Sequence, residues 1–208
     1  MAPASSTRPG SRPRTWPAAA ALTLGFTPVL WVLEAWDRWT PAVLDDDGIR
    51  PRSSEGLLGV LLAPLLHGGW GHLEANTPLV LLLMFLTLLG NIGRGLAVTA
   101  VIWLVAGIGT WLVAPSDTVH VGASGLVFGW LVFLVLRGWF AQSLGQVLLG
   151  ALLFLAYGGI LWGVLPGQPG ISWQGHLFGA VGGLVAARRF ARRDETREAA
   201  PTPYRRRA

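Results

Sequence analysis

The sequence contains no cysteine and few charged residues. Without cysteine there can be no disulfide framework and no thiolate metal site, and the redox compartment stays open. Only 13% of the 208 residues are charged, whereas 52% are hydrophobic. A soluble domain of this size needs a more polar surface, so the composition indicates a membrane protein.

Lysine is also absent, and the arginines cluster at the two ends of the chain. A pI near 11 could indicate a nucleic-acid partner. In a membrane protein, terminal arginines are better explained as topology signals and contacts with anionic lipids. We therefore expect membrane lipids as partners and no nucleic acid. Residues 1–17 and 191–208 are predicted to be disordered cytoplasmic tails, with an organelle transit peptide as the alternative for the first.

Long apolar runs fill the chain between these tails. A membrane-spanning helix needs roughly 20 residues to cross a hydrocarbon core of about 30 Å. The predicted spans are 18–36, 71–90, 95–114, 124–136, 146–165 and 171–190. The apolar segment 56–66 is too short to span and is expected in the interface or against the bundle. We predict an all-α membrane protein, with residues 18–190 forming one bundle of six transmembrane helices.

Six spans place both termini on one side of the membrane. The arginines of both tails, together with Arg94 and Arg137, then lie on that side, while the opposite loops hold few. This is the positive-inside pattern, so both termini are predicted to be cytoplasmic. The abundant Arg, Ala and Gly favour a bacterial plasma membrane over an organelle membrane.

The fourth apolar run is the shortest, because it begins at Ser124 and stops at Arg137. A helix over 124–136 measures roughly 20 Å, which is too short to cross. If Arg137 marks the inner surface, Ser124 lies on the order of 10 Å below the outer one. Irregular backbone at that depth is tolerated only where protein buries it or water reaches it, so we expect a water-filled cavity above Ser124.

Ser124 lies between glycines in Gly122-Ala123-Ser124-Gly125 and is a candidate nucleophile. Serine needs a base to take its proton, and His176 is the candidate. Taken alone, such a serine is better explained as a small residue at a helix contact. Several polar residues at comparable depth are costly in a membrane unless they are used, which favours a functional site.

His72 and Asn76 are four residues apart, so on a helix they share one face. Both can donate hydrogen bonds to a developing oxyanion. Ser124, at the start of a helix, adds free backbone N–H groups and the positive end of the helix dipole.

Two glycine stripes accompany the serine and the histidine. The residues are Gly125 and Gly129 in the fourth run, and Gly175, Gly179 and Gly183 in the sixth. Such stripes let two helix backbones approach closely, which would bring the imidazole within reach of the hydroxyl. They could equally support dimerisation, and the oligomeric state stays open.

Three motifs together resemble the rhomboid family of intramembrane serine proteases. They are His67-x4-His72-x3-Asn76, then Gly122-Ala123-Ser124-Gly125, then Gly175-His176-x2-Gly179-x3-Gly183, on the second, fourth and sixth predicted spans. The resemblance implies a rhomboid-like bundle without a cofactor.

The resemblance also implies the roles of individual residues. Ser124 is expected to be the nucleophile and His176 its base, without a carboxylate, while His72, Asn76 and the Ser124 N–H hold the oxyanion. Phe128 stands where the family places an aromatic residue that stacks on the base, and packing alone is expected to fix the ring. The implied function is an endopeptidase that hydrolyses peptide bonds in or near transmembrane segments of substrate proteins.

Other polar residues receive weaker interpretations. His67 falls on the family's first histidine, where a hydrogen bond that braces a loop is expected. Glu74 lies about 200° around the helix from His72 and should face another side. His120 is expected to face water, and Glu34 to lie near the outer end of the first span, where a charge costs little.

One feature of the family is missing from the first outer loop. The family's Trp-Arg pair is not evident there, because Arg50 and Arg52 lie too far upstream of His67.

Four other classes compete with the protease. A metalloprotease lacks a His-Glu-x-x-His motif, and no metal site is expected. A soluble esterase elbow fails because residue 126 is leucine. A catalytically inactive relative that binds transmembrane helices should lack Ser124 or His176, and both are present. A transporter would suit the intramembrane polar residues, but the two halves of the chain show no internal repeat.

Overall fold

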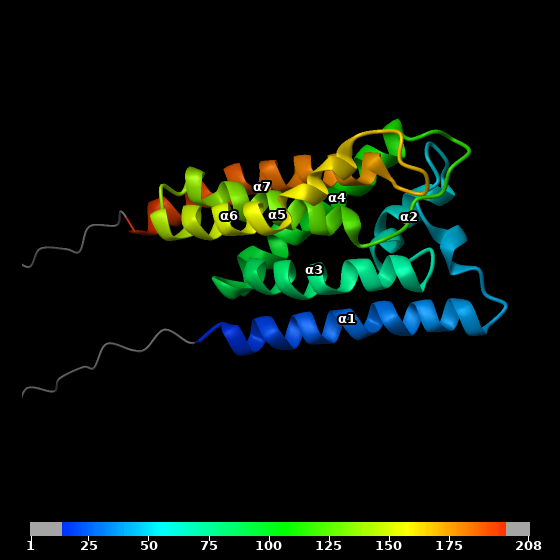
Figure 1. Ribbon diagram of the computed structural model, residues 1–208, viewed down its shortest axis with the longest axis horizontal. Coiled ribbons are helices and arrows are strands. Elements are labelled where there is room, and N and C mark those ends of the chain that lie inside the picture. The colour runs from blue at the N-terminus through cyan, green and yellow to red at the C-terminus, as the bar shows by residue number, and fades with distance from the viewer. Residues whose placement is uncertain (1–13, 199–208) are drawn as a thin grey trace, which may run out of the picture.

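The computed structural model describes residues 14–198, with side chains over 14–191. These residues form seven α-helices and three short 3-10 helices, without a strand (Figure 1). In chain order they are α1 (Trp16–Trp39), η1 (Leu44–Asp47), α2 (Glu55–Leu62), η2 (Ala63–Leu65), α3 (Trp70–Leu89), α4 (Ile92–Val113), α5 (Ser124–Phe140), α6 (Leu144–Tyr157), η3 (Gly158–Val164) and α7 (Trp173–Glu198). The outer parts of both predicted tails, 1–13 and 199–208, lie outside the described residues.

Four segments of the described chain are long and apolar enough to cross a membrane. They are α1, α3, α4 and the continuous run Leu144–Val164 formed by α6 and η3. α5 is apolar but has 17 residues, and α2 with η2 is shorter still. The protein is therefore an all-helical, membrane-embedded protein, and the count of six spans remains a prediction.

Two helices run further than the apolar pattern predicted. α5 continues through Arg137 to Phe140, and α7 continues to Glu198, so residues 191–198 are helical where we predicted a disordered tail. Arginine is a good helix former, and a charge therefore ends an apolar run without ending the helix.

The glycine stripes lie where α5 and α7 meet. A Cβ atom on Gly179 would lie 2.1 Å from the carbonyl oxygen of Gly125, and one on Gly183 would lie 2.2 Å from that of Gly129. Only glycine permits backbones this close. The stripes are thus used for a contact inside one chain, and that contact holds the first turns of α5 and α7 together.

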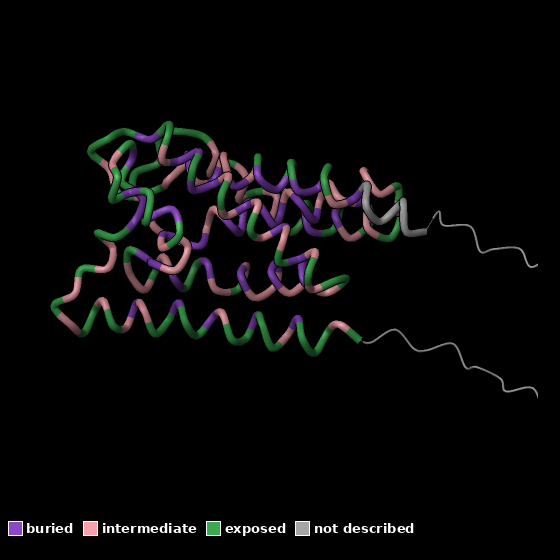
Figure 2. Tube along the Cα trace, turned by 180° about the vertical axis from the view of Figure 1, so that it is seen from behind, coloured by how far each residue is buried: buried purple, intermediate pink, exposed green. Residues whose placement is uncertain are grey.

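α1 lies at the margin of the bundle and packs mainly on α3. Its buried positions follow one stripe, while the rest of the helix is exposed (Figure 2). Trp31 on α1 packs against Trp70 at the start of α3, with ring centroids 5.7 Å apart and the rings tilted by 37°. The larger core lies between α3, α4, α5 and α7, where Trp130, Phe133 and Leu134 are almost fully buried.

The segment between α1 and α3 covers one end of the bundle and is tied to α4. Arg52, with a left-handed φ of 58°, donates to the carbonyls of Leu112 and Ala114 at 3.1 and 2.7 Å. Trp111 returns a hydrogen bond from its indole N–H to the carbonyl of Ser53 at 2.9 Å. These bonds fix the segment between α1 and α3 without the family's Trp-Arg pair.

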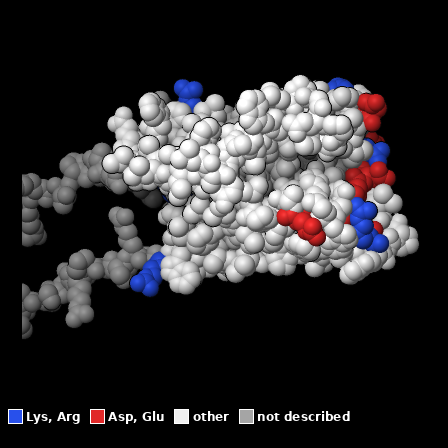
Figure 3. Space-filling view, viewed as in Figure 1, with Lys and Arg blue, Asp and Glu red and all other residues white. Residues whose placement is uncertain are grey.

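On the face shown in Figure 3, most charged side chains lie toward the two ends of the molecule, one acidic patch lies further inward, and the surface between is largely uncharged. The start of α1 and the end of α7 lie at the same end of the bundle (Figure 1). This layout suits a protein that holds its middle band in hydrocarbon.

Candidate active site

Ser124 and His176, the predicted pair, lie side by side. Ser124 is the first residue of α5 and His176 lies in the first turn of α7. The hydroxyl oxygen of Ser124 lies 2.9 Å from Nε2 of His176. The loop before Ser124 is held by the Gly122 N–H, which donates to the carbonyl of Ala63 at 2.8 Å. The arrangement can transfer a proton from the hydroxyl to the imidazole.

The ring of His176 is held on three sides. Its Nδ1 lies 3.0 Å from the carbonyl oxygen of Gly163 in η3. A carbonyl can only accept, so Nδ1 carries the hydrogen and Nε2 is left to accept from Ser124. Phe128 stacks on the ring with centroids 4.0 Å apart and an angle of 12°.

This arrangement corrects the expectation that packing alone fixes the ring. Gly163 was missed, because its contribution comes from a backbone carbonyl, which every residue has. A larger residue would be tightly packed at this place, since a Cβ there would lie 3.0 Å from Nδ1 of His176 and 3.0 Å from Phe128.

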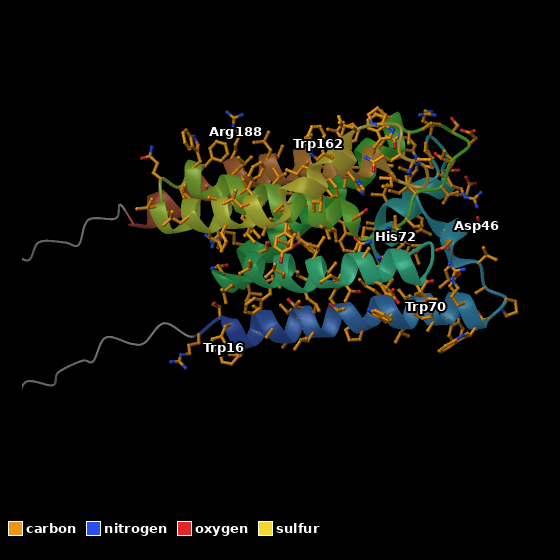
Figure 4. The ribbon with its side chains drawn as sticks, viewed as in Figure 1. Trp16, Asp46, Trp70, His72, Trp162 and Arg188 are labelled. Carbon is orange, nitrogen blue, oxygen red and sulfur yellow. The ribbon has the colours of Figure 1, made fainter. Side chains whose placement is uncertain are left out.

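His72 and Asn76 line the same cavity as Ser124. His72 lies on the side of α3 that faces α5 (Figure 4). Its ring packs against Gly122, where φ is +117° and a Cβ would lie 2.6 Å from Cε1 of His72. Asn76 is buried and donates from Nδ2 to the carbonyl of His72 at 2.9 Å, which leaves its second amide hydrogen for another acceptor.

His67 lies behind these residues and is almost fully buried. Burial and the neighbouring His72 lower the pKa of His67 to about 4, so its ring is neutral at pH 7. Nε2 then accepts a long hydrogen bond of 3.4 Å from the backbone N–H of Ala123. This is the loop-bracing contact expected for His67.

A cavity of about 780 Å³ opens over the pair. It is lined by residues of α3 and η3 and by the segments 118–121 and 170–172. Its polar lining includes His72, Asn76, Ser124 and His176. The space is large enough for water and for a short stretch of peptide.

Three further residues were predicted from the sequence. Glu74 is exposed on α3, as expected. Glu34 is only 2% exposed and forms an ion pair with Arg38 at 2.8 Å. It is therefore a buried, paired charge, whereas we expected one near the helix end with little desolvation cost. His120 does not simply face water, because its ring bonds Thr118 and Ser172, each at 2.8 Å. Over the part of the chain that the structure describes, no group of three His, Cys, Asp or Glu side chains could hold a metal ion.

Fold and site together define a helical membrane protein with a serine and a histidine paired in a cavity. The model of the rhomboid domain matches residues 54–193, so the chain belongs to the rhomboid family. No solved structure matches the chain.

The chain is also similar to several curated bacterial proteins. An uncharacterized protein of Mycobacterium tuberculosis is 44% identical over 201 residues, which cover 87% of this chain and 83% of that protein. An uncharacterized protein of Mycobacterium leprae is 42% identical, over 83% of this chain and 71% of its own length. A Bacillus subtilis protein named "Putative rhomboid protease YdcA" is 33% identical over 129 residues, 60% of this chain and 63% of its own.

Proposed function

We propose that this protein is an intramembrane serine endopeptidase that cleaves peptide bonds in or near transmembrane segments of other membrane proteins. The observation that carries the proposal is the 2.9 Å contact between Ser124 and His176 inside the cavity. The hydrogen bond from His176 to Gly163 supports it, because it leaves Nε2 free to act as a base.

In the proposed reaction, the Ser124 hydroxyl transfers its proton to Nε2 of His176 while the oxygen attacks the scissile carbonyl. The tetrahedral intermediate collapses as His176 returns that proton to the leaving amine, and an acyl-enzyme remains. His176 then takes a proton from a water molecule, which attacks the ester. A second collapse returns the proton to Ser124 and releases the carboxylic acid.

The negative oxygen of each intermediate would be held by His72, Asn76 and the backbone N–H of Ser124. As the first residue of α5, Ser124 has an N–H without an acceptor inside the helix. Removing one donor of this kind commonly costs about 3 to 4 kcal/mol of transition-state stabilisation. The proposed chemistry needs no cofactor.

Substrates would be the membrane helices of other proteins, which reach the cavity sideways. The cavity that contains Ser124 is lined by both α3 and η3, which supports a path between helices. The mycobacterial relatives support a bacterial plasma membrane. The positive-inside pattern supports an orientation in which both termini are cytoplasmic.

The proposal is tested by covalent labelling with a fluorophosphonate in detergent or vesicles. Wild type should be labelled, whereas Ser124→Ala should not be labelled and His176→Ala should be labelled very slowly. The same two variants should lose cleavage of a model transmembrane substrate while their helical circular dichroism stays unchanged.

Two results would argue against the dyad. Full activity in either variant would reject it. Loss of wild-type activity with EDTA, restored by zinc, would favour a metal-dependent reaction instead.

A further inference from the structure

His120 connects two loops that approach from different sides of the site. Its Nδ1 lies 2.8 Å from the hydroxyl of Ser172, and its Nε2 lies 2.8 Å from the hydroxyl of Thr118. The backbone of His120 pairs with Ile49 in both directions, at 2.9 and 3.1 Å. The imidazole is therefore fixed to the outer loop by its backbone and to the Ser172 segment by its ring.

The directions of these hydrogen bonds follow from their partners. Thr118 donates its hydroxyl hydrogen to the carbonyl of Pro115 at 2.6 Å, so it accepts from Nε2–H of His120. Burial lowers the pKa of His120, so the ring is neutral at pH 7 and Nδ1 has no hydrogen. Ser172 then donates to Nδ1, and its oxygen accepts from the backbone N–H of Gly175 at 3.3 Å.

Ser172 directly precedes α7 and satisfies the helix's first backbone donors. Its side chain accepts from Gly175 N–H, and its carbonyl accepts from His176 N–H at 3.1 Å. An N-terminal cap of this kind fixes the first turn of a helix. The first turn of α7 carries His176, so the residue that caps this helix is bonded directly to His120.

The same histidine lies four residues before Ser124 in the chain. Between them, Gly122 N–H is bonded to Ala63 and Ala123 N–H to His67, so this short segment is tied down along its length. Because this segment is anchored, His120 is a fixed point from which Ser172, and with it His176, is positioned relative to Ser124.

Packing does not replace this contact. His120, Ser172 and Ser124 line the large cavity and also a second, small cavity of about 30 Å³. Part of each side chain therefore faces a cavity instead of neighbouring side chains, so loss of the hydrogen bond is not fully replaced by packing.

We propose that the His120–Ser172 pair sets the position of His176 relative to Ser124, which makes His120 a positioning residue for the reaction. The inference rests on the proposed function. It goes beyond that function because neither residue touches the reacting atoms.

The test compares four single variants, the double variant that combines His120→Phe with Ser172→Ala, and one control variant, all as full-length protein in detergent. His120→Phe keeps a ring but removes the acceptor, whereas in His120→Asn the amide oxygen can take the place of Nδ1. Ser172→Ala removes the hydroxyl and Ser172→Thr keeps it. Ser143→Ala is the matched control, because Ser143 precedes α6 in the same way but makes no capping side-chain bond.

The measurements are kcat and KM for a transmembrane substrate, and the rate of fluorophosphonate labelling. All rates are normalised to the fraction of protein that is labelled at the end of the reaction. His120→Phe and Ser172→Ala should each lower kcat and the labelling rate about tenfold, because small displacements of reacting groups are costly. KM should stay unchanged. His120→Asn and Ser172→Thr should recover most of the rate, the double variant should be no slower than either single one, and Ser143→Ala should match wild type.

Four outcomes would overturn the inference. Lower thermal stability with an unchanged kcat per labelled site would mean a structural role only. A raised KM with unchanged kcat would mean that His120 contacts substrate. Equal labelling of wild type and His120→Phe would refute the positioning role alone, whereas no labelling of wild type would refute the proposed hydrolase and the positioning role with it.

Discussion

His176 is oriented without a carboxylate, and the surrounding residues explain how. The carbonyl of Gly163 takes the hydrogen of Nδ1 at 3.0 Å, as the carboxylate does in a catalytic triad. A carbonyl is neutral, so it orients the ring without adding a buried negative charge. The stacked ring of Phe128 limits rotation of the imidazole about its Cβ–Cγ bond.

Replacing Phe128 by alanine should therefore slow the reaction more than it weakens substrate binding. A stacked aromatic pair contributes about 0.5 to 1.5 kcal/mol beyond its buried area, which corresponds to a rate loss of up to about tenfold. The measurement is kcat and KM for a transmembrane substrate, with Phe128→Tyr as the comparison that retains the ring. An unchanged kcat in Phe128→Ala would show that the Gly163 bond suffices.

At the scale of the helix, the spacing of α5 and α7 decides whether the serine and histidine meet. Gly125 and Gly129 on α5 face Gly179 and Gly183 on α7 so closely that backbone carbonyls occupy the space of missing side chains. The distance from Ser124 to His176 thus depends on close contact between the glycine backbones of α5 and α7.

Gly179→Ala should destabilise the bundle and reduce fluorophosphonate labelling. The new methyl group would lie 2.1 Å from the carbonyl of Gly125, and the two helices must move apart. Overpacking of this kind typically costs about 1 to 3 kcal/mol. Thermal unfolding in detergent and the labelling rate measure the two effects.

Gly145→Ala in the first turn of α6 is the matched control, since a Cβ there meets nothing within 4 Å. It should be neutral or slightly stabilising, because alanine is the better helix former. Equal behaviour of the two variants would contradict the close-contact explanation.

At the scale of the whole molecule, the loops at one end are held by polar contacts, whereas the middle is held by apolar packing. Glu34 near the end of α1 is buried and paired with Arg38. Asp45 in η1 lies 4.0 Å from the same arginine. Burial, with Asp37 and Glu34 nearby, raises the pKa of Asp45 to about 6 from its ordinary value of 3.8.

Asp45→Asn should therefore be more thermally stable than wild type at pH 7, and the difference should vanish near pH 4. A raised pKa means that the folded protein binds this proton more tightly than the unfolded chain does. The resulting stability is present below pH 3.8 and is lost as the pH rises through about 6. Unfolding temperatures of both proteins across this window give the difference. A variant less stable than wild type at pH 7 would show that the contact with Arg38 outweighs burial.

The helical membrane class and the family could be predicted from the sequence alone, and both are confirmed. Apolar run length and the spacing of polar residues are local properties, so they can be recognised without coordinates. The same local information predicted which polar residues should meet. It misplaced the ends of α5 and α7, because an apolar pattern detects lipid contact and not the end of a helix.

Only the tertiary structure decided what holds the reacting groups in place. The carbonyl of Gly163, which accepts from His176, lies 13 residues away in the chain, and the carbonyl of Ala63 accepts from the N–H of Gly122. Backbone carbonyls and N–H groups are the same at nearly every position, so the residue type does not predict which of them hold a side chain. Which of them face a side chain depends on how closely the helices pack, and that follows from the fold as a whole.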